Sequence, residues 1–401
     1  MTSPLPPLPP VKRLSPSIWR ILGGNPSKFT LQGTNTYLLG SGHQRILIDT
    51  AQGFPAWTKN LRDALQQVSG RSESQIDSNT GAETGTGTKI EITDCVLTHW
   101  HGDHVLGLGD LLALFPDCRI WKHSGSRCDP DSNLTRFHVR ELHDGQILSL
   151  DDDGDDQFNV RVVHTPGHTV DHVVLQIVSS READEVGALF TADNVLGHGT
   201  AVFEDLAVYI ASLKKMLGAL EGVSESSAST ASTAAPVAST AGSADAATSS
   251  TSMMKAYPGH GEVIDDATAK IKEYISHRAM RETEAMNVLL HGNTTGAAET
   301  KQTNTQKGAI TTTENKKSEA ERNQDEQVKE WTSMAMVKVI YAGYPASLHA
   351  PAEGGLLQVL KKLEGEGRVS RTKDGRWRAV DPSSTTAGGG GNSHNNGGGR
   401  L

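Results

Sequence analysis

Short apolar runs rich in β-branched residues recur between residues 34 and 193, and they predict a series of strands. FNVRVVHT (158–165) is the clearest of them, because Phe158, Val160 and Val162 alternate on one face with the period of two that a strand requires. The other predicted strands are TNTYLLG (34–40), RILIDT (45–50), VLT (96–98), DHVVLQIVS (171–179) and ALFTAD (188–193).

Helical spacing near 3.6 residues appears in two places between and after these strands. One is marked by Leu106, Leu111, Leu112 and Phe115. The other, DDATAKIKEYISHRAMRETEAMNVLLHG (265–292), repeats Ile271, Tyr274, Ile275 and Leu289 and places Gly292 where a helix often ends. Strands mixed with helices predict an α/β domain.

Composition separates this domain from segments that bury too little apolar surface to offset the entropy of ordering. We expect a Pro-rich N-terminal arm, an α/β domain with low-complexity insertions, a flexible linker, a small second domain and a disordered Gly-rich tail. These are residues 1–17, 18–291 (insertions 71–88 and 222–252), 292–324, 325–381 and 382–401. In the small domain, helices expected at 325–341 and 347–366 precede two strands around a D-G turn, which indicates a winged helix.

Charge and cysteine content exclude some classes of protein. The formal net charge of −9 argues against a chain that works mainly by neutralising phosphates. Three cysteines without a C-x-x-C pair argue against a disulfide scaffold or a thiolate metal site. Because no apolar run approaches a membrane span and the N-terminus lacks a signal-peptide pattern, we expect a cytoplasmic protein without a membrane partner.

The stretch THWHGDH (98–104) places three histidines and an aspartate directly after an apolar strand, where unpaired polar groups are costly. Further candidates follow other predicted strands: His168 in HTPGHT, Asp193 in FTADN and His260 in AYPGHG. Imidazoles with carboxylates suit Zn²⁺ or Mn²⁺ better than Ca²⁺, which prefers oxygen ligands. A metal centre at the strand ends is therefore predicted.

The series ILIDT, THWHGDH, TPGHT, TADN and YPGHG resembles the metallo-β-lactamase superfamily over residues 18–290. The resemblance implies an αββα sandwich with a small C-terminal winged-helix-like domain, and two Zn²⁺ ions, with Mn²⁺ as the alternative. It implies that Asp49 orients the loop of the THWHGDH motif without binding metal. It also implies that one ion is held by His99, His101 and His168, the other by Asp103, His104 and His260, and that Asp193 lies between the two ions. Two such ions would activate a shared hydroxide.

Three longer stretches resemble the lactamase-beta-2 group: GGNPSKFTLQGTNTYLLGSG, FTADNVLGHGTAVFED and YAGYPASLHAPAEGGLLQVLKKLEGEGRV. That group includes animal endoribonucleases and fungal thioesterases that release polyketides from an acyl carrier protein in secondary metabolism. The resemblance therefore implies an acyl thioesterase acting on a carrier-bound polyketide. The alternatives are an endoribonuclease for single-stranded RNA and a catalytically idle metal-binding module. The sequence leaves the oligomeric state open.

Two residues are candidates for catalysis beyond metal binding. Asp103 could orient the water or carry the proton of the leaving group, and His198 in GHGT could either contact substrate or structure its loop. In the small domain, the candidate recognition helix balances Lys361 and Lys362 against glutamates. Its wing, RTKDGRWRAV, is more basic and carries Arg371, Lys373, Arg376 and Arg378.

Overall fold

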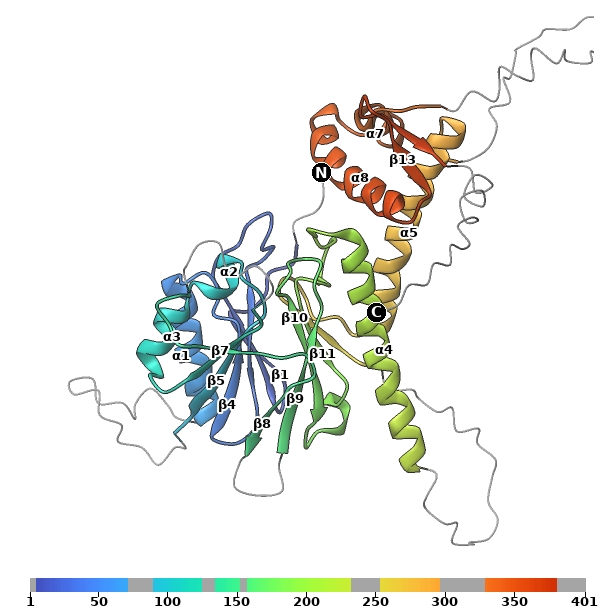
Figure 1. The fold of residues 1–401 in the computed structure, drawn as a ribbon. Coiled ribbons are helices and arrows are strands. Elements are labelled where there is room, and N and C mark those ends of the chain that lie inside the picture. The colour runs from blue at the N-terminus through green and yellow to red at the C-terminus, as the bar shows by residue number, and fades with distance from the viewer. Residues whose placement is uncertain are drawn as a thin grey trace, which may run out of the picture. The chain divides into compact units, whose positions relative to one another are not determined.

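The computed structural model describes residues 5–70, 89–124, 134–151, 157–231, 253–295 and 329–380. The chain divides into two compact units, Met1–Ser276 and His277–Leu401 (Figure 1). Within the described residues, no helix combines the length and apolarity that crossing a membrane requires. The linker predicted at 292–324 and the predicted insertion at 71–88 lie largely or wholly outside the described residues, as does the tail at 382–401.

The first unit contains a seven-stranded sheet in which every strand pairs with its sequence neighbours, in the order β1 to β7. β1 to β4 are antiparallel, and β4 to β7 run parallel to one another. The strands are β1 (Val11–Ser15), β2 (Ile18–Leu22), β3 (Asn35–Leu39), β4 (Gln44–Ile48), β5 (Glu91–Leu97), β6 (Arg119–Lys122) and β7 (Val139–Glu141).

A second sheet of five strands has the order β12-β11-β10-β9-β8. Its pairs are antiparallel except for β11 and β12, which are parallel. The strands are β8 (Ile147–Asp151), β9 (Gln157–His164), β10 (Val173–Ser179), β11 (Leu189–Ala192) and β12 (Ala256–Pro258). Phe158, Val160 and Val162 of β9 are buried together, so the predicted alternation is confirmed.

The two sheets pack face to face, with helices outside (Figure 1). One apolar cluster joins their inner faces, including Ile18, Leu39 and Ile46 from the first sheet and Val160 and Leu175 from the second. A second cluster joins the outer face of the first sheet to α1 (Pro55–Ser69) and α3 (Leu108–Leu114). The αββα sandwich implied by the resemblance is therefore what the structure shows.

The second sheet is flanked by α4 (Leu206–Ala231) and α5 (Ala267–His291). Gln176 of β10 donates a hydrogen bond to the carbonyl of Ala219 in α4, which fixes this helix to the sheet. The sequence predicted α5, but neither α1 nor α4.

The structure differs from the sequence in three of the predicted segments. β1 lies inside the predicted N-terminal arm (1–17) and pairs with β2, so this arm contributes a strand. α4 extends to Ala231, into the segment 222–252 that the sequence predicted to be flexible, and residues 232–252 of that segment lie outside the described residues. The compact units separate after Ser276, within α5, rather than at the predicted boundary after residue 291.

In the second unit, α7 (Ser333–Ile340), η3 (Ala346–Leu348) and α8 (His349–Gly365) are followed by the hairpin β13 (Val369–Arg371) and β14 (Trp377–Ala379). This is the predicted winged-helix arrangement. The first helix begins at Ser333, where Thr332 caps it by accepting a hydrogen bond from the main-chain nitrogen of Ala335. Of the helix predicted from residue 325, residues 325–328 lie outside the described residues and 329–332 are not helical.

Candidate metal centre

The histidine-rich motif begins where β5 ends at Leu97, deep in the first sheet. Thr98 and His99 continue from the strand, and His101 immediately precedes the short helix α2 (Gly102–Val105). Asp103 and His104 lie on this helix, which turns them back beside the first two histidines. Gly102 has no left-handed backbone conformation there, so the structure does not show that this turn requires a glycine.

Asp49 holds this motif in place from the end of β4. One carboxylate oxygen accepts a hydrogen bond from the Thr98 main-chain nitrogen at 2.8 Å, and the other accepts from the Thr98 hydroxyl at 2.9 Å. The second oxygen also accepts from His104 Nδ1 at 2.7 Å. Because Nδ1 faces Asp49, Nε2 is the nitrogen of His104 that faces Asp103 and Asp193. Burial opposes the charged form of His104, but Asp103 and Asp49 outweigh it and raise its pKa well above its usual range, so His104 must lose a proton to bind a cation.

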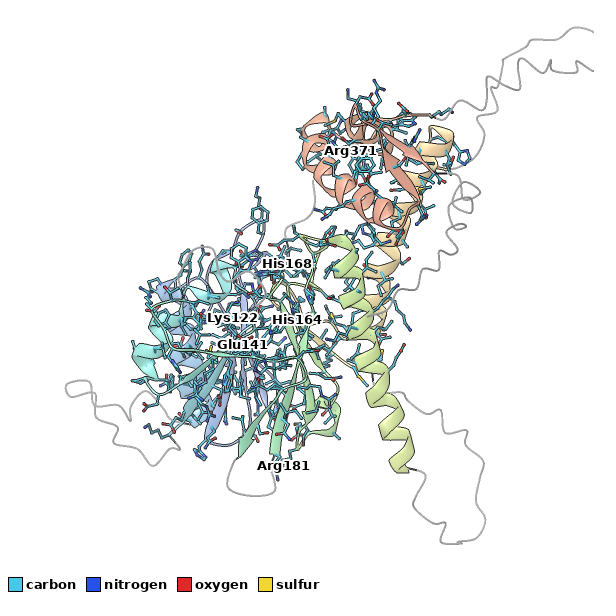
Figure 2. The ribbon with its side chains drawn as sticks, in the orientation of Figure 1. Lys122, Glu141, His164, His168, Arg181 and Arg371 are labelled. Carbon is cyan, nitrogen blue, oxygen red and sulfur yellow. The ribbon has the colours of Figure 1, made fainter. Side chains whose placement is uncertain are left out.

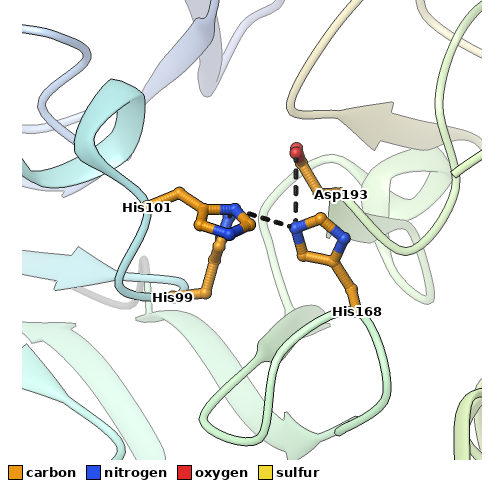
Figure 3. A group of neighbouring side chains, drawn as sticks. All are labelled: His99, His101, His168 and Asp193. Atoms are coloured by element: carbon orange, nitrogen blue, oxygen red, sulfur yellow. Dashed lines mark hydrogen bonds and ion pairs between the residues drawn. The ribbon is translucent and has the colours of Figure 1, made fainter. Parts of the chain in front are cut away.

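Three imidazoles and one carboxylate form the first cluster (Figure 3). His101 Nδ1 lies 3.0 Å from His99 Nε2 and 3.1 Å from His168 Nε2. Asp193 Oδ2 lies 3.7 Å from His168 Nε2. The main-chain carbonyl of Val202 accepts a hydrogen bond from His168 Nδ1 at 2.7 Å. The other ring nitrogen of His168, Nε2, is therefore the one that can bind a metal ion.

The second cluster consists of Asp103, His104 and His260. Asp103 Oδ2 lies 3.2 Å from His260 Nε2 and 3.5 Å from His104 Nε2. Asp193 approaches both histidines, with Oδ1 at 3.4 Å from His104 Nε2 and Oδ2 at 3.3 Å from His260 Nε2. Asp193 therefore lies between the two clusters.

Two Pro-Gly turns bring the distant ligands to this point. A Cβ on Gly167 would lie 2.4 Å from the Cα of Tyr209, and a Cβ on Gly259 would lie 2.4 Å from Asp193 Oδ1. Neither position has room for a side chain, so glycine is required for His168 and His260 to reach the centre.

The two clusters differ in protonation. Burial and the neighbouring imidazoles of His104 and His168 lower the pKa of His99 well below its usual range, and burial with the same kind of neighbours lowers that of His101 to about 4. Burial opposes the charged form of His260 too, but Asp193 and Asp103 outweigh it and raise its pKa to about 9. At neutral pH, His99 and His101 therefore offer neutral imidazoles, whereas His260 must lose a proton to bind a cation.

The carboxylates are held in their ionised form despite burial. Burial raises the pKa of Asp103, but His104 and His260 more than offset it and bring the pKa to about 2. Burial acts in the same direction on Asp193, yet His260 and His104 keep its pKa well below its usual range. Two negative charges thus remain among the histidine side chains of the two clusters.

This arrangement fits a divalent metal ion. His104 Nε2 and Asp193 Oδ1 are buried and face each other at 3.4 Å without a hydrogen bond that meets normal geometry, and a cation placed between them would satisfy both atoms. In the first cluster, His101 Nδ1 lies near the Nε2 atoms of both His99 and His168. Neutral imidazoles do not carry enough protons to make every one of these contacts a hydrogen bond, whereas a cation could be bound by all three nitrogens. Imidazole and carboxylate are ligands suited to Zn²⁺ and similar ions.

The clusters open into a cleft with a volume of about 590 Å³. Five metal-cluster side chains line it, together with an apolar wall formed by Phe29, Leu31, Leu196, Val202 and Phe203. His198 also lines the cleft, and its Nε2 is buried without a hydrogen-bond partner among the described residues. Whether His198 contacts substrate or structures its loop therefore stays a prediction.

Some residues of the site were not found from the sequence. Thr34 donates a hydrogen bond from its hydroxyl to Asp103 Oδ2 at 3.4 Å, and Asn25 accepts from the Thr34 main chain at 2.9 Å. His172 Nε2 accepts from the Asp193 main-chain nitrogen at 3.2 Å. These contacts join segments far apart in the chain, and no local pattern marks them.

Comparison with known sequences identifies the family. A family model described as the metallo-beta-lactamase superfamily matches residues 29–223, and one described as a beta-lactamase associated winged helix domain matches residues 332–377. The chain is 32% identical to an atrochrysone carboxyl ACP thioesterase of Aspergillus chevalieri, covering 94% of this chain and 92% of the relative. It is 34% identical to a beta-lactamase-like protein 2 homolog of Drosophila melanogaster, and this match covers 94% of this chain and 98% of the relative.

Comparison with solved structures supports the fold. A beta-lactamase domain protein from Burkholderia ambifaria has a TM-score of 0.55 at 17% identity, covering 92% of this chain and 93% of that one. A metallo-beta-lactamase family protein from Thermus thermophilus has a TM-score of 0.52 at 17% identity, and this match covers 92% of this chain and 100% of that one. With the two clusters and the sandwich in place, the family models and the relatives at 32% and 34% identity show that the chain belongs to the metallo-β-lactamase superfamily of hydrolases.

Proposed function

We propose that this protein is an acyl thioesterase that uses two zinc ions to release an acyl chain from an acyl carrier protein. The observation that carries the proposal is the pair of ligand clusters joined by Asp193 at the floor of an open cleft. Relatives over most of the chain are named as thioesterases for carrier-bound atrochrysone carboxyl groups, which supports this substrate class.

The proposed ligands follow the geometry. His99, His101 and His168 would hold one ion, Asp103, His104 and His260 the other, and Asp193 would contact both. Bound ions of this kind supply a hydroxide near neutral pH and polarise the carbonyl under attack. Mn²⁺ could replace zinc, since imidazole and carboxylate ligands accommodate either ion.

The chain's own residues have distinct tasks in this reaction. Hydrolysis forms a bond between a water oxygen and the acyl carbon and breaks the carbon–sulfur bond, giving a carboxylate and a thiol. The Asp103 carboxylate faces the cleft and is held by Thr34 and His260, so it can accept the water proton and pass it to the departing sulfur. The apolar wall of the cleft would hold the acyl chain and exclude water from it.

His198 is proposed to contact the substrate. Its loop is rigid, because the Tyr274 hydroxyl accepts a hydrogen bond from the Leu196 main chain at 3.2 Å and donates to the Gly199 carbonyl at 3.0 Å. A Cβ on Gly197 would lie 2.3 Å from main-chain atoms of Glu262, so this loop packs directly against the segment that carries His260. His198 is thereby held beside the metal ligands.

A hydrolysis assay tests the proposal. Zinc-loaded protein should release free thiol from an acyl thioester carried on an acyl carrier protein, and the matching Asp193→Ala protein should release none. A 20-nucleotide single-stranded RNA in the same buffer should remain intact. Cleavage of RNA by the native protein, with the thioester unchanged, would replace the thioesterase proposal with an endoribonuclease.

A further inference from the structure

The winged-helix unit carries a compact basic surface on its β13–β14 hairpin, which we call the wing surface: Arg371, Lys373, Arg376 and Arg378. All four side chains are exposed. Arg376 pairs with Asp374 at 3.0 Å. Among the residues that the structure describes, no carboxylate lies within ion-pair distance of the other three. The wing surface therefore presents a net positive charge in a chain whose overall charge is −9.

The neighbouring helix does not share this charge. In α8, Lys362 Nζ lies 2.9 Å from Glu282 and 2.6 Å from Glu366, and Arg368 lies 3.4 Å from Glu366. These ion pairs neutralise the cations at the end of α8. These paired cations contrast with Arg371, Lys373 and Arg378 of the wing surface.

The hairpin holds its cations in defined positions. The Arg371 guanidinium lies over the Trp377 ring, 5.6 Å from its centroid, and Arg378 Nε donates a hydrogen bond to the Ser370 hydroxyl at 3.1 Å. The Trp377 main chain exchanges hydrogen bonds of 2.8 and 2.9 Å with Trp331. Figure 2 shows Arg371 on this hairpin. A surface fixed in this way loses little side-chain entropy when a charged partner binds.

We infer that the wing surface binds the acidic face of the acyl carrier protein that delivers the substrate, an inference that rests on the proposed thioesterase function. A carrier with exposed Asp and Glu residues and a phosphodiester at the root of its prosthetic arm complements this charge, and complementary charge mainly accelerates encounter. RNA fits less well, because α8 offers no basic stripe and the hairpin's aromatic residue, Trp377, is buried rather than available for stacking on bases.

The test compares two double variants with equal changes in net charge. Lys373→Glu/Arg378→Glu reverses the wing surface, whereas Arg62→Glu/Lys272→Glu reverses two exposed cations on α1 and α5. For each full-length protein, fluorescence anisotropy gives the Kd for a labelled polyketide-synthase acyl carrier protein that bears its unacylated phosphopantetheine arm. Thiol release gives kcat and KM for the acylated carrier and for a short pantetheine thioester of the same acyl group.

The wing variant should raise the Kd and the KM for the carrier about tenfold at low salt, with the difference shrinking in 0.5 M salt, as expected of a screened interaction. Its kcat and its hydrolysis of the pantetheine thioester should match those of the control variant. Equal carrier Kd values for the two variants would overturn the inference. A wing-dependent Kd for a labelled 20-nucleotide RNA without one for the carrier would assign the surface to nucleic acid instead.

Failure of the proposed function has a different signature. If the native protein hydrolyses neither thioester, the thioesterase proposal is wrong. The anisotropy measurement still decides whether the wing surface binds the carrier, because it requires no turnover.

Discussion

Replacing Asp49 by Asn separates the role of this carboxylate from that of the metal ligands themselves. Asp49 is buried and accepts hydrogen bonds from Thr98 and from His104 Nδ1, the latter at 2.7 Å. The side-chain oxygen of an asparagine can still accept a hydrogen bond from the Thr98 main-chain nitrogen. The amide nitrogen that replaces the second carboxylate oxygen cannot accept the His104 proton. His104 would then favour the tautomer with the proton on Nε2, the atom that faces Asp103 and Asp193.

The expected loss can be worked out from this one contact. A hydrogen bond between an imidazole and a carboxylate contributes about 1.5–3 kcal/mol. Its loss corresponds to roughly a ten- to hundredfold weaker affinity, the range typical when a residue supporting a metal ligand is changed. The effect should fall on the ion held by Asp103, His104 and His260, and spare the ion held by His99, His101 and His168.

The measurement is metal content after dialysis against buffered zinc, together with the absorption spectrum of the cobalt-loaded protein. Asp94→Asn is the matched control, because Asp94 is equally buried on β5 but pairs with Arg119 and Trp121, away from the clusters. Asp49→Asn should retain about one ion where the control retains two. Equal zinc affinity in the two variants at both sites would refute the reasoning.

Three further predictions follow from the same geometry. His101→Ala and Asp193→Ala should each abolish thiol release and lower the zinc content, measured by elemental analysis, because each removes a proposed ligand; normal turnover in either would contradict the ligand assignment. The pKa of His260 is about 9 without a cation, so a zinc ion that binds at neutral pH must displace the proton of this imidazole. Zinc affinity measured by calorimetry should therefore rise between pH 6.5 and 8.5, and an affinity that does not change with pH would contradict this. Gly197→Ala would place a Cβ 2.3 Å from neighbouring main-chain atoms, so it should lower the melting temperature and slow hydrolysis. The control Gly218→Ala, at an open position of α4, should raise the melting temperature slightly. Similar melting temperatures for the two variants would show that the loop at Gly197 can shift to accommodate the added methyl group.

The residues of the two clusters could be predicted from the sequence because each lies in a short, recognisable motif that follows a strand or contains a Pro-Gly turn. His168 and His260 show why: glycine at the preceding position is required by contacts of 2.4 Å, so the motif records a steric constraint. The winged helix was predictable for a similar reason, since the D-G turn at 374–375 fixes its hairpin.

Other parts of the fold depend on tertiary contacts that no local pattern reveals. The sequence missed α4, whose end lies in a segment of small polar residues, and it missed β1, which is a strand because β2 offers a partner for it. Thr34 reaches Asp103 from the turn before β3 and was missed in the same way. In each case, the decisive neighbour lies on another element.

The central claim is that two metal ions bound at adjoining clusters drive thioester hydrolysis, and a metal titration tests it most directly. Metal-free protein would be titrated with Zn²⁺ while thiol release from an acylated carrier protein is followed continuously. The account predicts no activity without metal and full activity once two equivalents are bound. Hydrolysis by the metal-free protein, or no hydrolysis with two ions bound, would contradict it.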